Sequence, residues 1–132
     1  MSQANETFFT SVGCMDGRVQ KPIAGFGKNK FGAIYPDTIT EAGKVGILAH
    51  SPSKSFLKSL KHKLNISIDK HYSRGIIVHG HEDCAGNPVE EKTHKEDVRK
   101  SVEIVKKLIS NKVPVHGVFL KRGEPEWIVE EL

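Results

Sequence analysis

Two short segments of the chain combine residue types and spacings that could support metal chemistry. Cys14, Asp16 and Arg18 alternate in the first segment, and two residues separate His81 from Cys84 in the second. Two thiolates and one imidazole form a donor set that suits zinc. Three protein ligands leave a fourth position for water or for a nearby carboxylate, and such an open position is typical of a catalytic zinc site.

The same residues also have plainer interpretations. Free cysteines are commonly small buried hydrophobic residues, so His81-x-x-Cys84 taken alone is a weak signal. Asp16 and Arg18 could form an ordinary ion pair on the surface. The alternation of these two residues with Cys14 favours a functional loop, because an extended backbone places alternate side chains on the same side.

The elements that would position these segments alternate between strands and helices. Apolar and β-branched runs predict strands at 7–12, 75–79 and 113–120, with a weaker strand at 38–40 and another at 127–129. Helical spacing of apolar residues predicts helices from about Ser53 to Leu64 and over 94–111. Residues 19–35 contain three glycines among lysines and phenylalanines, which indicates an irregular surface segment.

This alternation predicts an α/β fold in one domain spanning residues 1–132. The expected architecture is a mostly parallel central β-sheet flanked by helices, with residues 127–129 as an antiparallel edge strand at the C-terminus. Cys14 follows the first strand and Cys84 follows the central one. Because functional groups gather beyond the carboxyl ends of parallel strands, Cys14, His81 and Cys84 are expected to converge.

Composition excludes several classes of protein. The chain has 132 residues, of which 37% are hydrophobic, and this suits a single compact domain. A net charge of +4, spread along the chain, argues against a nucleic-acid binder. No apolar run is long enough for a membrane helix, and the first residues lack the features of a signal peptide. Two cysteines do not form a disulfide scaffold, so we expect a cytoplasmic protein.

The two chemical segments together resemble the β-class carbonic anhydrases. That family has C-x-D-x-R after the first strand and H-x-x-C after a central strand, the positions held here by Cys14 to Arg18 and His81 to Cys84. The apolar strand at 76–81 is similar to the family's strand that leads into Gly-His, and Ala42 and Gly43 match part of a family turn. Gly17 and Ala85 depart from the residues usual in the family, and only about six residues precede the first strand, where family members carry a helical arm.

The resemblance implies a site and an activity. Cys14, His81 and Cys84 would bind Zn²⁺, and a zinc-bound hydroxide would hydrate carbon dioxide to bicarbonate, with better activity at alkaline pH. Asp16 would orient the hydroxide, and Arg18 would keep Asp16 ionised and in place. In a closed form, Asp16 would itself become the fourth ligand. The resemblance also implies a homodimer or higher homo-oligomer that acts on a small-molecule substrate, carbon dioxide or bicarbonate. Neither nucleic acid nor a membrane is expected as a partner.

Three alternatives stay open at this point. The same zinc chemistry would act on carbonyl sulfide or carbon disulfide, which are linear molecules of similar shape. The chain could instead be a non-catalytic zinc-binding protein on the same fold, or a redox switch in which Cys14 and Cys84 form a disulfide. No histidine is assigned as a proton shuttle, since each has an ordinary structural interpretation as well.

Overall fold

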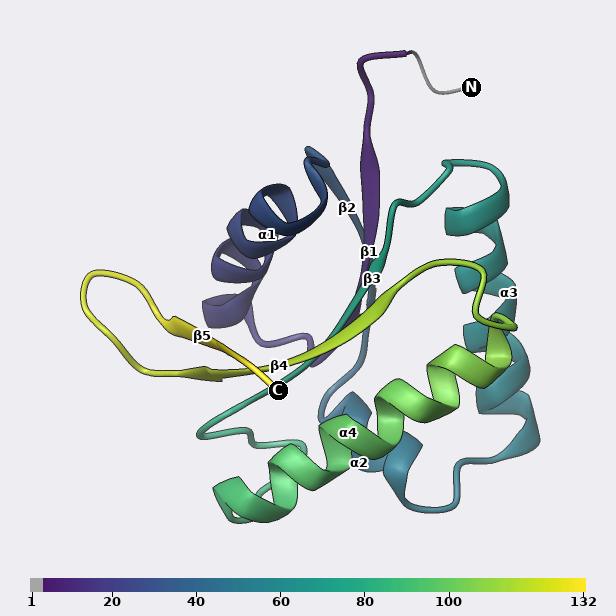
Figure 1. Ribbon diagram of the computed structural model, residues 1–132. Helices are drawn as coiled ribbons and strands as arrows, with labels where there is room; N and C mark the ends of the chain where they lie inside the picture. The colour runs from purple at the N-terminus through teal and green to yellow at the C-terminus, as the bar shows by residue number, and fades with distance from the viewer. Residues whose placement is uncertain (1–3) are drawn as a thin grey trace.

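The computed structural model describes residues 4–132 (Figure 1). This part of the chain contains five strands and four helices. The strands are β1 (Phe8–Gly13), β2 (Tyr35–Thr40), β3 (Ile76–His81), β4 (Val115–Lys121) and β5 (Ile128–Glu131). The helices are α1 (Gly17–Phe31), α2 (Lys44–Ala49), α3 (Lys54–Asp69) and α4 (Glu91–Leu108).

All five strands form one sheet in the order β2-β1-β3-β4-β5. The first four are parallel to their neighbours, and β5 pairs with β4 in the antiparallel direction. The predicted α/β fold, with a mostly parallel sheet and an antiparallel C-terminal edge, is therefore confirmed. Every residue of β3 is buried, as expected for a central strand that is covered on both faces.

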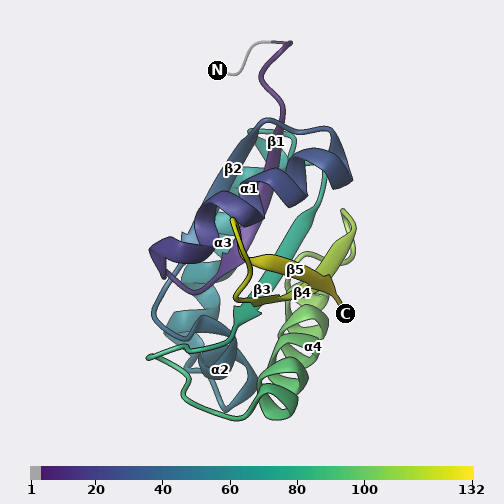
Figure 2. The same ribbon diagram turned by 90° about the vertical axis from the view of Figure 1, so that its left-hand side faces the viewer.

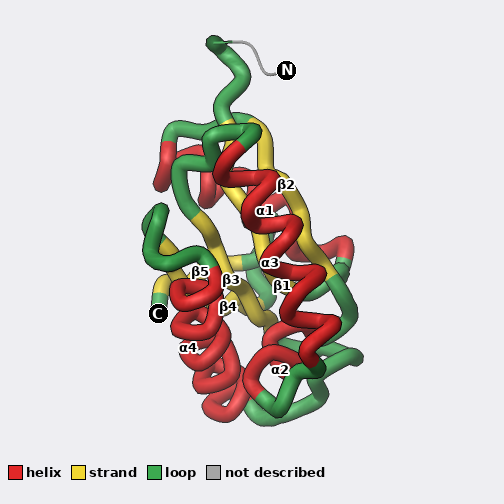
Figure 3. The backbone as a smooth tube through the Cα atoms, turned by 90° about the vertical axis from the view of Figure 1, so that its right-hand side faces the viewer, coloured by secondary structure: helices red, strands yellow, loops and turns green. Residues whose placement is uncertain are grey.

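Helices cover the two faces of the sheet unequally. Helix α1 covers one face, as the view in Figure 2 shows. Here Val19 and Ile23 of α1 pack against Phe9 and Ile77. The other face carries α2, α3 and α4, and Figure 3 shows α2 and α4 next to one another. Both layers of core remove apolar surface from water, which is the main force that holds the domain together.

The prediction of an irregular segment at 19–35 was wrong, because most of it is helix α1. The Asp16 side chain caps this helix by accepting a hydrogen bond from the Arg18 backbone N–H at 2.9 Å. Gly27 lies within the helix because of packing rather than flexibility. A Cβ atom there would lie 2.1 Å from Cζ of Phe9, so close contact with β1 requires glycine.

The remaining predicted elements are confirmed with small changes of boundary. Helix α3 begins after Ser53, whose hydroxyl accepts a hydrogen bond from the Phe56 N–H at 3.1 Å. It extends to Asp69, beyond the predicted end. The weak strand at 38–40 is the last half of β2. No helix within residues 4–132 is both long and apolar enough to cross a membrane.

Candidate metal centre

The structure brings Cys14, His81 and Cys84 together at one end of the sheet. Cys14 directly follows β1, His81 is the last residue of β3, and Cys84 lies in the loop after β3. Because β1 and β3 are parallel neighbours, both chain segments emerge at the same edge. The ligand atoms of the three residues lie within 4.8 Å of one another, and all three residues are buried.

The arrangement of donor atoms fits a tetrahedral metal ion. The Cys14 and Cys84 Sγ atoms lie 3.7 Å apart. Two sulfurs bound to one zinc at the usual length would be separated by roughly 3.8 Å. The Nδ1 atom of His81 contacts the Glu82 carbonyl oxygen at 2.7 Å, which fixes the ring and leaves Nε2 as the other donor atom. Nε2 is buried and has no hydrogen-bond partner among the described residues, as expected of a metal ligand.

The electrostatics of the two thiols also favour a cation. Burial, followed by the neighbouring Cys14, raises the pKa of the Cys84 thiol. A backbone N–H from Gly43 points to the Cys14 sulfur at 3.5 Å. Because burial disfavours negative charge, two adjacent thiolates need a positive ion between them. Metal binding at this site is therefore expected to release thiol protons.

Two glycines allow the loops around the cysteines to meet. Gly43 adopts a left-handed backbone conformation with φ of 62°, just before α2. A Cβ atom on Gly86 would lie 2.5 Å from the Gly43 nitrogen, and one on Gly43 would lie 2.3 Å from the Gly86 oxygen. This close approach holds the Cys84 loop against the turn that contacts Cys14.

Asp16 and Arg18 form a tightly bonded pair beside the Cys–His–Cys group. The Arg18 Nε atom donates to the Asp16 carboxylate at 3.0 and 3.2 Å, and its Nη2 atom donates to Asp16 Oδ2 at 2.7 Å. These hydrogen bonds are the main reason that the pKa of Asp16 is lowered to about 2. Asp16 Oδ2 also lies 3.9 Å from His81 Nε2. An ionised carboxylate therefore stands next to the donor atoms while Arg18 holds it.

Three further residues complete the surroundings of Arg18 and were not assigned from sequence. Asp83 accepts hydrogen bonds from Arg18 and from Arg122, and the Trp127 ring lies under both guanidinium groups. The sequence signal for Asp83 is its position inside the His81-x-x-Cys84 segment. No sequence signal pointed to Arg122 or Trp127, because these residues reach the site only through the β4–β5 hairpin.

Two other histidines, His79 and His50, lie in different environments. His79 is fully buried, and its Nε2 atom lies 3.1 Å from Ser11 Oγ. Burial, then the nearby His81, lowers the pKa of His79 to about 3, so this ring stays neutral. The exposed His50 ring contacts the buried Asp97 carboxylate at 2.9 Å. None of these contacts by itself assigns a proton shuttle.

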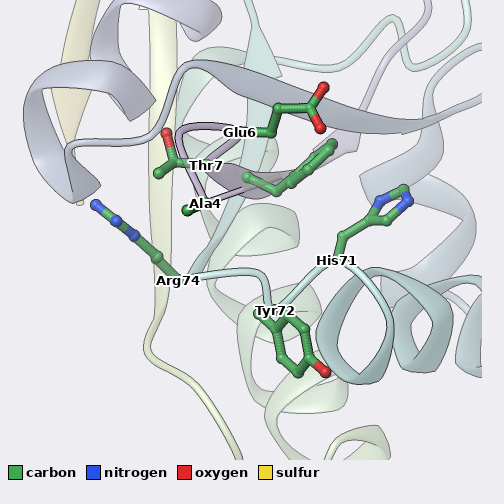
Figure 4. A pocket seen from close by; sticks show the side chains of 7 residues that line it. Ala4, Glu6, Thr7, His71, Tyr72 and Arg74 are labelled. Carbon is green, nitrogen blue, oxygen red and sulfur yellow. The ribbon is translucent and has the colours of Figure 1, made fainter. Parts of the chain in front are cut away.

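A separate pocket lies at the opposite end of the strands (Figure 4). It has a volume of about 280 Å³, and its walls include Thr7, His71, Tyr72 and Arg74. Thr7 precedes β1 and Arg74 precedes β3, whereas the cysteines follow those strands. Six residues of extended chain span roughly 20 Å, so this pocket is remote from the Cys–His–Cys group.

Comparison with known families identifies the fold and the family. A family model described as "Putative carbonic anhydrase" matches residues 4–132. The chain belongs to this carbonic anhydrase family. Comparison with curated proteins finds no significant sequence match.

Solved carbonic anhydrases share the fold at low sequence identity. The enzyme from Streptococcus mutans is 18% identical with a TM-score of 0.61, over 99% of this chain and 86% of that one. The β-carbonic anhydrase CafA of Aspergillus fumigatus is 12% identical with a TM-score of 0.61, over 96% and 76% of the two chains. One of two tetrameric β-carbonic anhydrases from Sordaria macrospora is 13% identical with a TM-score of 0.61, over 96% and 81%. The resemblance to the β-class that the motifs indicated is confirmed.

Proposed function

We propose that this member of the carbonic anhydrase family is a zinc-dependent lyase that reversibly hydrates carbon dioxide to bicarbonate. The observation that carries the proposal is the buried convergence of Cys14, His81 and Cys84 beside an ionised Asp16. Family membership supports the reaction class. The choice of zinc follows from two sulfur donors and one imidazole donor.

Different residues of the chain have different roles in this reaction. Cys14, His81 and Cys84 hold the ion, which when bound supplies Lewis-acid activation of water near neutral pH. Asp16 accepts a hydrogen bond from the attacking water and orients its lone pair towards carbon dioxide. Its depressed pKa keeps it an acceptor throughout the working pH range, while Arg18 fixes its position. Each turnover consumes one water and one carbon dioxide, and yields one bicarbonate and one proton that passes to solvent.

We further propose that the protein works as a homo-oligomer. The Sordaria macrospora relatives are described as tetrameric. In this chain β2 forms an edge of the sheet, and Ile34 and Tyr35 at its start are exposed. An unpaired edge with apolar neighbours is suited to pairing with a second copy. Light scattering coupled to size-exclusion chromatography would measure the mass, and a monomer at micromolar concentration would contradict this proposal.

We also propose that residues 1–132 form a single domain. The protein is proposed to work in a reducing compartment such as the cytoplasm. One sheet connects elements from residue 8 to residue 131, and Cys14 and Cys84 are free thiols. Thiolates that bind a metal must remain unoxidised.

Stopped-flow measurement of carbon dioxide hydration by zinc-loaded protein would test the activity. We expect a zinc-dependent rate that rises from about pH 7 to 9, because ionisation of the activated water limits the reaction. Metal-free protein serves as the control. No rate above buffer with one zinc bound per chain would contradict carbon dioxide hydration, and carbonyl sulfide would then be assayed on the same sample.

A further inference from the structure

We infer that Trp127 and Arg122, which the C-terminal hairpin brings to the site, are positioning residues that hold Arg18 on Asp16 and keep this carboxylate away from the metal. This inference rests on the proposed function for its consequence in turnover. Its structural part is that Trp127 and Arg122 keep the Asp16 carboxylate away from the Cys–His–Cys group. This part can be tested without measuring turnover.

Arg18 is held on two sides by carboxylates. Its Nε and Nη2 atoms donate to Asp16, while Nη1 donates to Asp83 Oδ2 at 3.1 Å and Nη2 also donates to the Asp83 carbonyl oxygen at 3.1 Å. Every nitrogen of the guanidinium group therefore has an acceptor. Because the group is planar and rigid, its bonds to Asp83 determine where it can meet Asp16.

Trp127 supports the same guanidinium group through its ring. The Arg18 Cζ atom lies 4.9 Å from the ring centroid, and the Arg122 Cζ atom lies 5.1 Å from it. The ring also contacts His81 with an edge-on geometry at 6.0 Å between centroids. Trp127 thus contacts both a ligand residue and the arginine that holds Asp16. Arg122 completes the network through its bond to Asp83 at 2.5 Å.

The hairpin that carries Trp127 is fastened to the rest of the domain. Lys95 of α4 bonds to Glu130 of β5 at 2.6 Å and to Glu91 at 2.9 Å. Lys121 of β4 bonds to Glu91 at 3.1 Å. Single exposed ion pairs stabilise little, but a connected set restrains the hairpin at several points. Trp127 consequently has a defined place beside Arg18.

Loss of this support has a specific consequence for Asp16. Its carboxylate already lies 3.9 Å from His81 Nε2, and Arg18 is the cation that holds it. A carboxylate released from Arg18 would find its strongest remaining attraction at a bound metal ion. Asp16 would then compete with an external ligand for the fourth position on the metal. The competition is expected to grow as the network around Arg18 weakens.

Cobalt-loaded protein provides a spectroscopic test, since thiocyanate binding at the open position changes the visible absorption of cobalt. We expect Trp127→Leu and Arg122→Gln to weaken thiocyanate binding about three- to tenfold, the range for loss of a cation–π contact or a charged hydrogen bond. Trp127→Phe should retain most of the affinity because it keeps an aromatic face. Arg99→Gln, an exposed arginine on α4, is the matched control and should bind like wild type.

A second substitution separates positioning from general damage. Adding Asp16→Asn to Trp127→Leu or to Arg122→Gln removes the competing carboxylate and should restore thiocyanate affinity. Unfolding midpoints measured on the same samples identify any variant that fails to fold, and Arg122→Gln is the variant expected to fold normally. Unchanged affinity in both single variants would overturn the inference, as would a loss that Asp16→Asn does not restore.

Turnover of the zinc forms separates this inference from the proposed function. We expect kcat for carbon dioxide hydration to fall in parallel with thiocyanate affinity while zinc content stays constant. A wild-type protein without hydration activity, whose cobalt spectra still follow the pattern above, would contradict the proposed function and support the positioning role. A fully active wild type would support the proposed function. If Trp127→Leu and Arg122→Gln then left both thiocyanate affinity and kcat unchanged, the positioning role would be contradicted.

Discussion

The sulfur atoms of Cys14 and Cys84 lie 3.7 Å apart, although 70 positions separate the two residues in the chain. Their proximity follows from the sheet order, because β1 and β3 are neighbours while β2 lies on the far side of β1. The candidate metal centre is thus formed by the tertiary fold. Removing a ligand or the metal should therefore affect binding and stability together.

His81→Gln is expected to abolish tight metal binding, because the site loses its imidazole donor and is left with two buried thiols. Zinc content after dialysis, measured by elemental analysis, should fall from one per chain to near zero. His62→Gln, on the exposed face of α3, should retain zinc. A chelator should lower the unfolding midpoint of wild type by about 15 °C, as expected for a ligand at a thousandfold excess over its Kd, and should leave that of His81→Gln unchanged. Stoichiometric zinc in His81→Gln would refute its assignment as a ligand.

Asp16→Asn is expected to separate catalysis from folding. Asparagine caps a helix about as well as aspartate, so α1 should keep its start and the midpoint should change little. The neutral amide cannot serve as the ionised acceptor, and we expect kcat to fall about 100-fold, within the range for loss of an acid–base group. Asp69→Asn on the exposed part of α3 is the control. A wild-type kcat in Asp16→Asn, with zinc bound, would exclude a catalytic role for the carboxylate.

The buried His79 predicts a specific acid sensitivity. Burial lowers its pKa from 6.5 to about 3 in the folded protein, whereas the unfolded chain protonates it near its ordinary value. The unfolded state therefore binds more protons between these two values. The contribution of neutral His79 is complete above about pH 6.5 and is lost progressively as the pH falls towards 3.

Comparison with His79→Gln measures this effect. Urea unfolding of the metal-free proteins between pH 7.5 and 4.5 should show wild type losing about 1.4 kcal/mol more per pH unit below 6.5 than the variant. The shared titration of other groups cancels in the difference. Parallel pH dependences would mean that His79 is accessible to protons in the folded state.

Gly86→Ala is expected to disturb the metal centre without removing a ligand. The new Cβ atom would lie 2.5 Å from the Gly43 backbone nitrogen, so the two loops must separate. We expect a loss of roughly 1–3 kcal/mol in unfolding free energy, as for other overpacked sites, and zinc affinity at least tenfold weaker. Gly25→Ala on the exposed face of α1 has open space around its Cβ and should gain up to about 1 kcal/mol from helix propensity. Equal zinc affinity in Gly86→Ala and wild type would show that the loop contact is dispensable.

Elements whose signals are local could be predicted from the amino-acid sequence. Continuous apolar residues at 76–78 indicated a strand buried on both faces, and Ser53 marked the start of α3. Cys14 and His81 were identified because each stands at the end of a predicted strand within a motif. A strand or a helix cap depends on near neighbours in the chain, so its pattern is readable without the rest of the fold.

Features that depend on residues far apart in the chain could be identified only from the folded structure. Gly27 indicated a loop in the sequence, but the ring of Phe9 is what requires a glycine inside α1. Trp127 looked like an ordinary strand residue, and folding of the hairpin places its ring against Arg18. Such contacts join residues far apart in the chain, and their energies arise from close packing and charge in three dimensions. The motif therefore indicated the candidate ligands, and the folded sheet determined what surrounds them.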